Sequence, residues 1–358
     1  MPQLDLSASS IDLTRAICDV PSVSGDERAL ADLIDEAVGA LAHLEVSRDG
    51  DTIVARTMLG RAQRVVIAGH IDTVPINGNL PTRDIEIDGQ PYLWGRGTVD
   101  MKAGVAVQLK LAAELTDPRV DLTWMWYDHE EVDADLNGLT RLARMRPDLF
   151  AGDFAILGEP TGAQVEGGCN GNMRAIVRTR GVRAHSARAW IGENAIHRAG
   201  AVLERLSEYR PREVAVDGLE YREGLNAVRI HGGIAGNVIP DLCEVEVNYR
   251  FAPSLSPIDA EQHVRDVFSG FDVDVVDVAP GARPGLDAPL AREFVAAVGS
   301  APKPKYGWTD VARFSAMGIP AVNYGPGDPQ LAHHDEERVP LSQIEDVERG
   351  LRSWLTAS

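Results

Sequence analysis

The sequence predicts an α/β fold into which a smaller α+β domain is inserted. Short apolar strands alternate with helical stretches in both terminal regions, and polar residues follow several of these strands where they end. Between residues 172 and 282 the pattern changes to strands with a period of two and to helices rich in Ala and Leu. We therefore expect a large domain made from residues 1–171 and 283–358, interrupted by a small domain at 172–282.

The first part of the large domain is predicted to start with two amphipathic helices and to continue with alternating strands and helices. The helices lie near residues 11–18 and 27–41, and a third lies at 101–114. The strands are RVVIAGH (64–70), LTWMWY (122–127) and FAILGE (154–159), and the stretch GGCNG (167–171) ends this part. Since α/β sheets collect reactive groups at the carboxyl ends of their strands, the residues after these strands are candidates for a functional site.

The inserted domain is predicted to be a strand and helix unit of its own. It begins with NMRAIVRTRG (172–181) and contains strands at 228–233 and 243–251 and helices at 195–209 and 257–268. The loop APGARPG (279–285) ends it, after which the α/β pattern resumes.

Composition excludes several classes of function. With 35 basic and 54 acidic residues the net charge is −19, which does not fit a nucleic acid or an anionic membrane as partner. No apolar run approaches the roughly 18 residues that a membrane span needs, and no signal peptide is evident. The three cysteines are distant and odd in number, which is not typical of a disulfide framework. We expect a cytoplasmic protein that acts on a small molecule.

Polar residues with the chemistry of metal ligands follow successive strands. Taken singly, each has an ordinary explanation: a hydrogen-bonded histidine, a helix cap at Asp100, or a solvated turn at Glu130 and Glu131. Taken together they favour a pair of divalent cations, because burying so many carboxylates without a cation would cost several kcal/mol each. Imidazole with carboxylate suits zinc. The set comprises His70, Asp72, Asp100, Glu130, Glu131, Glu159 and either His333 or His334.

The spacing within two of these motifs separates their roles. Neighbouring residues of an extended chain point in opposite directions, so one of Glu130 and Glu131 can bind a metal while the other faces the substrate and moves a proton. Asp72 stands two residues after His70 and can point the same way. It is predicted to accept the second imidazole N–H of His70 and so fix its tautomer.

The ordered motifs HID, GRGTVDMK, HEEV, GEPT and LAHHDEE resemble those of the M20 group of dinuclear zinc amidohydrolases and carboxypeptidases. The resemblance runs from about residue 10 to 350. It implies a zinc-peptidase-like catalytic domain with a mixed sheet flanked by helices. It also implies that the inserted domain is a lid and that the protein is a homodimer joined through this lid.

The resemblance assigns metal ligands to individual positions. His70, Asp100 and Glu159 would hold one zinc, and Asp100, Glu131 and His333 the other, with Asp100 bridging. Cobalt or manganese could substitute for zinc. His333 is preferred to His334 because the family's last histidine is usually followed four residues later by Glu, here Glu337.

The resemblance also implies a hydrolytic mechanism. Glu130 would take a proton from a water activated by the zinc pair and return it to the leaving amine, with Asp72 as the clamp on His70. His185, in GVRAHSARAW, would enter the partner's active site to stabilise an oxyanion. A purely structural histidine is the alternative. The peptide bond after Asp100 is typically cis in similar enzymes.

Substrate contacts are implied at four further positions. They are Asn237 in GNVIPD, Arg250 in NYRFAPS, and Thr309 and Arg313 in GWTDVARFS. Surface salt bridges are the alternative for both arginines. Two arginines aimed into one site suit a substrate with several carboxylates.

Several phrases, including NYRFAPS and NYGPGDP, resemble the actinobacterial desuccinylases of diaminopimelate and lysine biosynthesis. They imply hydrolysis of N-succinyl-LL-2,6-diaminopimelate to succinate and LL-2,6-diaminopimelate. One motif departs from the pattern: VEGGCNGNMR replaces the arginine-rich turn of some desuccinylases, and Arg174 could serve instead.

Two alternatives stay open. One is another M20 amidohydrolase, such as an acetylornithine deacetylase, an N-acyl amino acid deacylase, or a metallo-carboxypeptidase or dipeptidase. The other is a non-catalytic binding protein on the same fold.

Overall fold

The computed structural model describes residues 3–357, which divide into two compact units. The first unit runs to Gly167 and resumes at Pro284–Lys303 and from Thr309. The second unit comprises Gly168–Arg283 and Pro304–Trp308. The insertion predicted at 172–282 lies inside the second unit, to which the short segment Pro304–Trp308 also belongs. Each unit has its own core, so each is described separately.

The first unit is built on a mixed eight-stranded sheet, as the family resemblance implies, with the strand order β1-β2-β6-β3-β7-β18-β8-β17. Its centre is parallel, because β3 runs parallel to both β6 and β7, and β18 runs parallel to β7. The strands are β1 (Glu45–Asp49), β2 (Thr52–Arg56), β3 (Arg64–His70), β6 (Asp121–Tyr127), β7 (Phe154–Leu157), β8 (Glu166–Gly167), β17 (Lys303–Pro304) and β18 (Ala321–Asn323).

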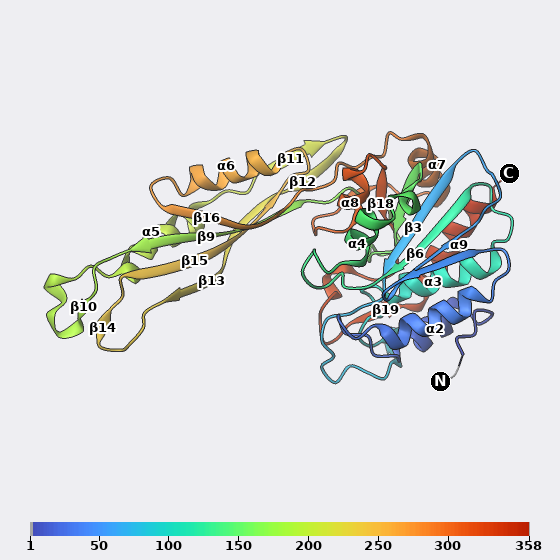
Figure 1. Ribbon diagram of the computed structural model, residues 1–358, viewed down its shortest axis with the longest axis horizontal. Helices are drawn as coiled ribbons and strands as arrows, with labels where there is room; N and C mark the ends of the chain where they lie inside the picture. The colour runs from blue at the N-terminus through green and yellow to red at the C-terminus, as the bar shows by residue number, and fades with distance from the viewer. Residues whose placement is uncertain (1–2, 358) are drawn as a thin grey trace. The chain divides into compact units, whose positions relative to one another are not determined.

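In the described part of this unit, seven α-helices flank the sheet, and Figure 1 labels α2, α3, α4, α7, α8 and α9 around it. They are α1 (Ser10–Cys18), α2 (Arg28–Gly39), α3 (Lys102–Glu114), α4 (Gly138–Met145), α7 (Pro289–Val298), α8 (Val311–Ala316) and α9 (Leu341–Thr356). The helix predicted at 27–41 is shorter than expected at both ends. Apolar residues of the strands and helices form one continuous core, in which β6 is buried along its whole length.

Helix α3 packs closely against the end of strand β7. A Cβ atom at Gly104 would lie 2.3 Å from the carbonyl oxygen of Gly158, so only glycine permits this approach. A Cβ atom at Gly325, just after β18, would lie 2.1 Å from the same carbonyl oxygen. These two glycines therefore fix the backbone that leads into Glu159.

A small three-stranded sheet, in the order β19-β5-β4, was not predicted. Its strands are β4 (Arg83–Ile87), β5 (Gln90–Trp94) and β19 (Arg338–Pro340). The last of these comes from a distant part of the chain, so local patterns give no sign of the pairing. The sheet connects the segment before Asp100 with the segment after His333.

The second unit is an antiparallel four-stranded sheet, in the order β13-β15-β9-β16, with two helices on one face (Figure 1). The strands are β9 (Gly171–Arg180), β13 (Gly224–Gly232), β15 (Leu242–Phe251) and β16 (Asp272–Ala279), and the helices are α5 (Ala195–Glu208) and α6 (Pro257–Val267). Two small pairs complete it: β10 (Ala184–His185) with β14 (Val238–Ile239), and β11 (Glu213–Val216) with β12 (Leu219–Arg222).

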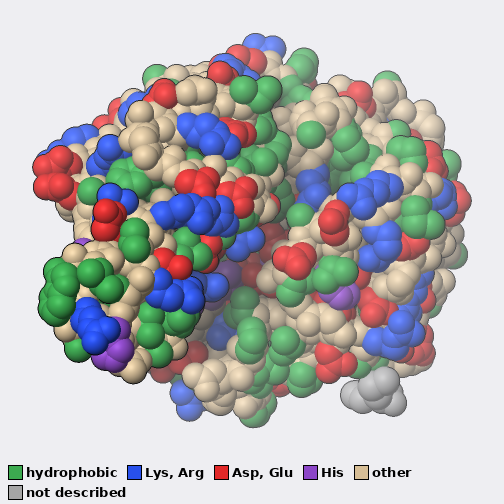
Figure 2. Space-filling model, turned by 60° about the vertical axis from the view of Figure 1, so that its left-hand side comes forward, with side chains coloured by type: hydrophobic (Ala, Val, Ile, Leu, Met, Phe, Trp, Pro, Cys, Tyr) green, Lys and Arg blue, Asp and Glu red, His purple; other side chains and the backbone are tan. Residues whose placement is uncertain are grey.

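The surface carries both signs of charge. On the face drawn in Figure 2, acidic and basic side chains are interspersed and form no extended basic area. Within residues 3–357, none of the helices combines the length and the apolar character that crossing a membrane requires.

Candidate metal centre and active site

Three parallel strands deliver polar side chains to one edge of the sheet. Strand β3 ends at His70, β6 ends at Tyr127 shortly before Glu130 and Glu131, and β7 ends shortly before Glu159. Because β3 pairs in parallel with both neighbours, the carboxyl ends of the three strands meet at the same edge.

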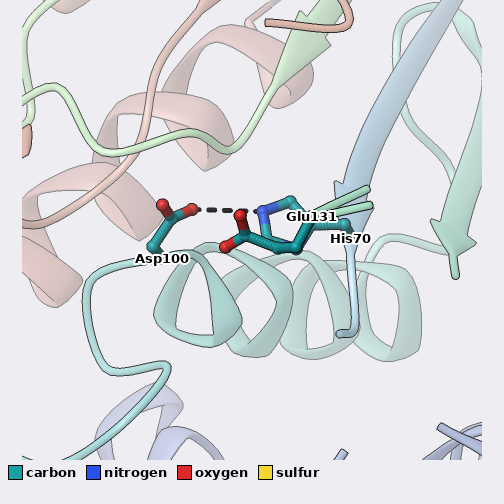
Figure 3. Close-up of side chains that lie close together, drawn as sticks. All are labelled: His70, Asp100 and Glu131. Carbon is teal, nitrogen blue, oxygen red and sulfur yellow. Dashed lines mark hydrogen bonds and ion pairs between the residues drawn. The ribbon is translucent and has the colours of Figure 1, made fainter. Parts of the chain in front are cut away.

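The centre of the site is a carboxylate between two imidazoles. Asp100 places one carboxylate oxygen, Oδ1, 3.1 Å from Nε2 of His70 and the other, Oδ2, 3.3 Å from Nε2 of His333. In Figure 3 the side chains of Asp100 and His70 point toward one another, with Glu131 beside them. Ligand atoms of His70, Asp100 and Glu131 all lie within 4.8 Å of one another. A carboxylate that offers one oxygen to each side has the geometry of a bridging ligand.

Asp100 does not cap the helix that follows it. The N-cap of α3 is Met101, and no side chain makes a capping hydrogen bond there. The backbone of Asp100 is instead held by Glu337, whose carboxylate accepts hydrogen bonds from the N–H groups of Val99 (2.8 Å) and Asp100 (3.0 Å). The Asp100–Met101 peptide bond is cis, as the resemblance implies.

The structure brings His333, and not His334, into contact with the carboxylates. Nε2 of His333 lies 3.0 Å from the Glu131 carboxylate, whereas Nδ1 of His334 accepts a hydrogen bond from the backbone N–H of Glu336. His333 has a positive φ of 64°, and its side chain is about half exposed.

Glu159 lies nearby but outside the tight group. Its side chain is buried, and its negative charge helps to raise the pKa values of Tyr127 and Glu130. Its carboxylate is therefore close enough to these groups to act electrostatically. Among the described residues, only His70, Asp100 and Glu131 have ligand atoms that all lie within 4.8 Å of one another.

The electrostatics of the cluster favour a bound cation. Burial alone would lower the pKa of His70, but its hydrogen bonds to Asp100 and Asp72 raise it well above its ordinary value. Hydrogen bonds to Asp100 and Glu131 raise the pKa of His333 to about 10. Each imidazole therefore holds a proton. Its positive charge balances the charge of the neighbouring carboxylates. Nitrogen and carboxylate oxygen donors in this arrangement fit a divalent metal such as zinc.

Asp72 contacts more groups than the sequence predicts. Nδ1 of His70 lies 3.0 Å from the backbone carbonyl of Asp72 and 3.5 Å from its carboxylate, so the carbonyl is the closer acceptor. The Asp72 carboxylate accepts hydrogen bonds from the backbone N–H groups of Glu130 (3.0 Å) and Glu131 (3.1 Å) and from Oγ of Ser24 (2.6 Å). Asp72 therefore orients the two glutamates as well as the histidine.

Glu130 has the electrostatic environment of a proton-transfer group. Burial raises its pKa well above the ordinary value, and the negative charges of Asp310, Glu159 and Glu131 raise it further, against a lowering effect of His70. A carboxyl group with a raised pKa can both accept and return a proton near neutral pH.

The contacts that hold the turn before Glu130 were missed by sequence reasoning. His129 has a positive φ of 58°, and its ring nitrogen Nδ1 lies 2.7 Å from Asp128. The buried carboxylate of Glu27 accepts a hydrogen bond from the backbone N–H of His129 (3.2 Å). The only local signal was the pair of acidic residues Asp26 and Glu27, which could not be assigned to a distant turn.

In the second unit, His185 lies on β10 and Asn237 directly precedes its partner strand β14. His185 is paired with Val238, and its Nδ1 accepts a hydrogen bond from the N–H of Ala187 at 3.0 Å. The backbone carbonyl of Asn237 accepts a hydrogen bond from the N–H of Ser186. Both side chains are exposed. The structure therefore brings these two residues together.

The arginines singled out from the sequence differ in their partners. Arg250, at the end of β15, donates from Nε to Oδ1 of Asn248 at 3.1 Å. Arg313 forms an ion pair with the buried Asp310, and Arg174 forms ion pairs with Glu246 and Asp277. Arg174 is thus already matched by two acids, which weakens its case as a substrate contact.

Thr309 belongs to the first unit. Its hydroxyl donates to Oδ1 of Asn323 at 2.9 Å, and the residue is buried. This contact fixes the start of α8 to the end of strand β18, at the same sheet edge as the cluster.

A mixed α/β sheet that gathers histidine and carboxylate side chains at one edge is the arrangement of a metal-dependent hydrolase. The chain belongs to peptidase family M20/M25/M40, whose family model matches residues 66–357.

Two relatives are similar over nearly the whole chain. A Mycobacterium tuberculosis (strain H37Rv) protein, whose name assigns it provisionally as the succinyl-diaminopimelate desuccinylase DapE, is 53% identical over 98% of this chain and 99% of its own length. The succinyl-diaminopimelate desuccinylase of Corynebacterium glutamicum is 46% identical over 99% of this chain and 98% of its own length.

Solved structures share the fold. A tripeptidase from Staphylococcus aureus has a TM-score of 0.77 at 20% identity, covering 99% of this chain and 98% of its own. The Bacillus subtilis YXEP protein, described as a dinuclear metal binding peptidase from the M20 family, has a TM-score of 0.70 at 16% identity, covering 97% and 96%. At these identities the likeness concerns the fold alone.

Proposed function

We propose that the protein hydrolyses N-succinyl-LL-2,6-diaminopimelate to succinate and LL-2,6-diaminopimelate, as a step of diaminopimelate and lysine biosynthesis in the cytoplasm. The observation that carries the chemistry is the Asp100 carboxylate, which offers one oxygen to each of two imidazoles beside Glu130. The substrate is supported by the near full-length similarity to two proteins named as succinyl-diaminopimelate desuccinylases.

The proposed cofactor is a pair of Zn²⁺ ions, with Co²⁺ or Mn²⁺ as possible substitutes. His70, Asp100 and Glu159 would hold one ion, and Asp100, Glu131 and His333 the other. When bound, such a pair supplies Lewis acidity, which lowers the pKa of water toward 7 and polarises an amide carbonyl.

Glu130 is the proposed general base and acid. Its raised pKa allows it to take a proton from the attacking water and to deliver it to the nitrogen of the leaving amine. Asp72 fixes the backbone of Glu130 through a hydrogen bond of 3.0 Å, so the carboxylate is held in place before the substrate arrives.

The proposed substrate carries three carboxylates, which require positive or hydrogen-bonding partners. Arg250 is the strongest candidate, because no ion pair with a carboxylate is found for it among the described residues and burial lowers its pKa. A partly buried guanidinium without an ion pair gains most from a carboxylate ligand. Asn237, Thr309 and Arg313 are proposed as further contacts. Arg313 would act together with Asp310, which already binds its Nε.

We propose that the second unit is both a lid and the place of homodimerisation. Strand β13 lies at the edge of its sheet and is exposed along most of its length. Two of its apolar side chains, Val228 and Ile230, are 57% and 50% exposed. An apolar edge strand of this kind can pair with a second copy. In such a dimer, the exposed His185 would stabilise the oxyanion in the partner's active site.

Substrate profiling tests the proposed function. The purified, zinc-loaded protein is given N-succinyl-LL-2,6-diaminopimelate, N-acetylornithine or a simple dipeptide, with a Glu130→Ala variant as control. Selective release of succinate that depends on Glu130 is the expected result. Preference for another amide would keep the hydrolase and overturn the substrate. Hydrolysis of none of the three would favour a non-catalytic binding protein.

A further inference from the structure

The second unit presents a face of charged side chains on the side of its sheet opposite to α5 and α6. On this face, each arginine of strand β9 has an acidic partner on a neighbouring strand. Arg178 contacts Glu244 at 2.8 Å and Asp274 at 3.3 Å, and Arg180 contacts Asp272 at 3.2 Å. Arg174 contacts Glu246 and Asp277, each at 3.5 Å. Most of the face is therefore a set of balanced ion pairs.

Arg250 is the exception on this face. Its cross-strand neighbours are Gly224 on β13 and Asn172 on β9, and Asn172 is followed on β16 by Ala279. None of these side chains carries a charge. Among the described residues, no carboxylate is found in an ion pair with Arg250, and none acts to raise its pKa. The sequence at this end of the sheet thus leaves a half-buried guanidinium without a counter-charge.

The Nε–H groups of Arg178 and Arg250 both donate to a side chain of β15, but the acceptor of Arg178 lies on the neighbouring strand and that of Arg250 lies two residues away on the same strand. For Arg178 the acceptor is Oε1 of Glu244 on β15, at 2.8 Å. For Arg250 the acceptor is Oδ1 of Asn248, also on β15, at 3.1 Å. Glutamate orients its arginine and cancels its charge, whereas asparagine orients its arginine and leaves the charge in place.

Asn248 is itself fixed by a second asparagine. Its Nδ2 donates to Oδ1 of Asn172 at 2.7 Å. Because the amide nitrogen is used in this way, the amide oxygen is turned toward Nε of Arg250. With Nε occupied, the terminal nitrogens of the guanidinium are left for a carboxylate, which they can bind through two parallel hydrogen bonds.

We propose that Asn248, held by Asn172, is a positioning residue that presents the terminal nitrogens of Arg250 to a carboxylate of the substrate. The proposal deepens the proposed function and rests on it. Asn248 acts through Arg250 and does not contact the reacting bond. Its neutral amide is the specific requirement, because an acid at this position would form the ion pair that the other arginines of this face already make.

Asn248→Asp tests this requirement, since it changes the charge and hardly changes the shape. With N-succinyl-LL-2,6-diaminopimelate as the probe, we expect KM to rise at least about tenfold while kcat stays within about twofold. Asn248→Ala should raise KM by a smaller factor. The control is Glu244→Gln, which alters the acceptor of the Arg178 Nε–H group and should leave both constants unchanged.

A double variant separates positioning from general damage to the fold. If Asn248 acts through Arg250, Asn248→Asp combined with Arg250→Ala should have the same KM as Arg250→Ala alone. Additive effects would overturn the proposal, as would an unchanged KM in Asn248→Asp or in Arg250→Ala. Failure of the proposed function is seen separately, because the unmodified enzyme would then release no succinate, and the proposal would fall with it.

Discussion

The sheet edge of the first unit and the charged face of the second unit both gather ionisable side chains, but they differ in how completely the charges are paired. On the charged face, Arg174, Arg178 and Arg180 are each matched by nearby acids at the surface. At the sheet edge, the partly buried carboxylates of Asp100 and Glu131 lie beside the imidazoles of His70 and His333. Matched charges in water contribute little beyond solubility and modest stability. Charges gathered out of water without a full counter-charge indicate where a ligand is to bind.

The largest expected effect comes from removing Glu130. Glu130→Ala should lower kcat about 10³- to 10⁴-fold, because general acid and base catalysis are both lost. The bound metals, measured by elemental analysis, should stay, since Glu130 is not a proposed ligand. In the unmodified enzyme, kcat/KM should fall as the pH falls through the raised pKa of Glu130, because the base must be deprotonated.

Asp133→Asn is the matched control, because Asp133 is an exposed acid in the same loop. It should retain full activity. Loss of the metals from Glu130→Ala would contradict the assignment of Glu130 as a base that binds no metal.

The next largest effect is expected for His185. His185→Ala should lower kcat about 10²- to 10³-fold with both metals retained, since one oxyanion donor is removed. Co-expression with Glu130→Ala, using different tags, tests whether His185 acts across a dimer. One site of the mixed dimer would combine an intact Glu130 with an intact His185 of the partner, so about half of normal activity per dimer should return. No recovery in the isolated mixed dimer would place His185 in its own subunit's site, and full activity of His185→Ala would remove its role.

A smaller effect concerns the metals. In the metal-free protein the pKa of His333 is about 10, so its imidazole carries a proton at neutral pH. A metal needs the neutral imidazole, hence binding must release this proton. Zinc affinity should therefore rise with pH, by up to about tenfold per pH unit for each proton released. Calorimetry in buffers with different ionisation enthalpies measures the release, and a pH-independent affinity would contradict the ligand set.

Much of the metal cluster could be predicted from the sequence, because its residues follow strands. His70 and Glu159 stand at the ends of apolar stretches, and parallel strands bring such ends together. The mixed sheet was predicted from the family resemblance rather than from the strand pattern. The family resemblance also pointed to His333 rather than His334, because the family's last histidine is usually followed four residues later by Glu, here Glu337.

The partners that hold these residues could not be predicted. Asp72 binds the backbone of Glu130 and Glu131 only because two loops pack together, and no pattern in either loop records the contact. The same is true of the two arginines. Whether Arg250 or Arg313 has an acid beside it depends on neighbouring strands and turns, and the sequence left salt bridges open for both.

The smallest effect is expected on the charged face, and it completes the comparison. Arg178→Ala removes contacts to Glu244 and Asp274 from a partly exposed network, so the free energy of unfolding should fall by no more than about 1 kcal/mol. Chemical denaturation measures this change, and kcat and KM should be those of the unmodified enzyme. Arg250→Ala should do the reverse, with a raised KM and little loss of stability, because no ion pair is broken. If Arg178→Ala also raised KM, the balanced part of this face would take part in binding, and the distinction between matched and unmatched arginines would fail.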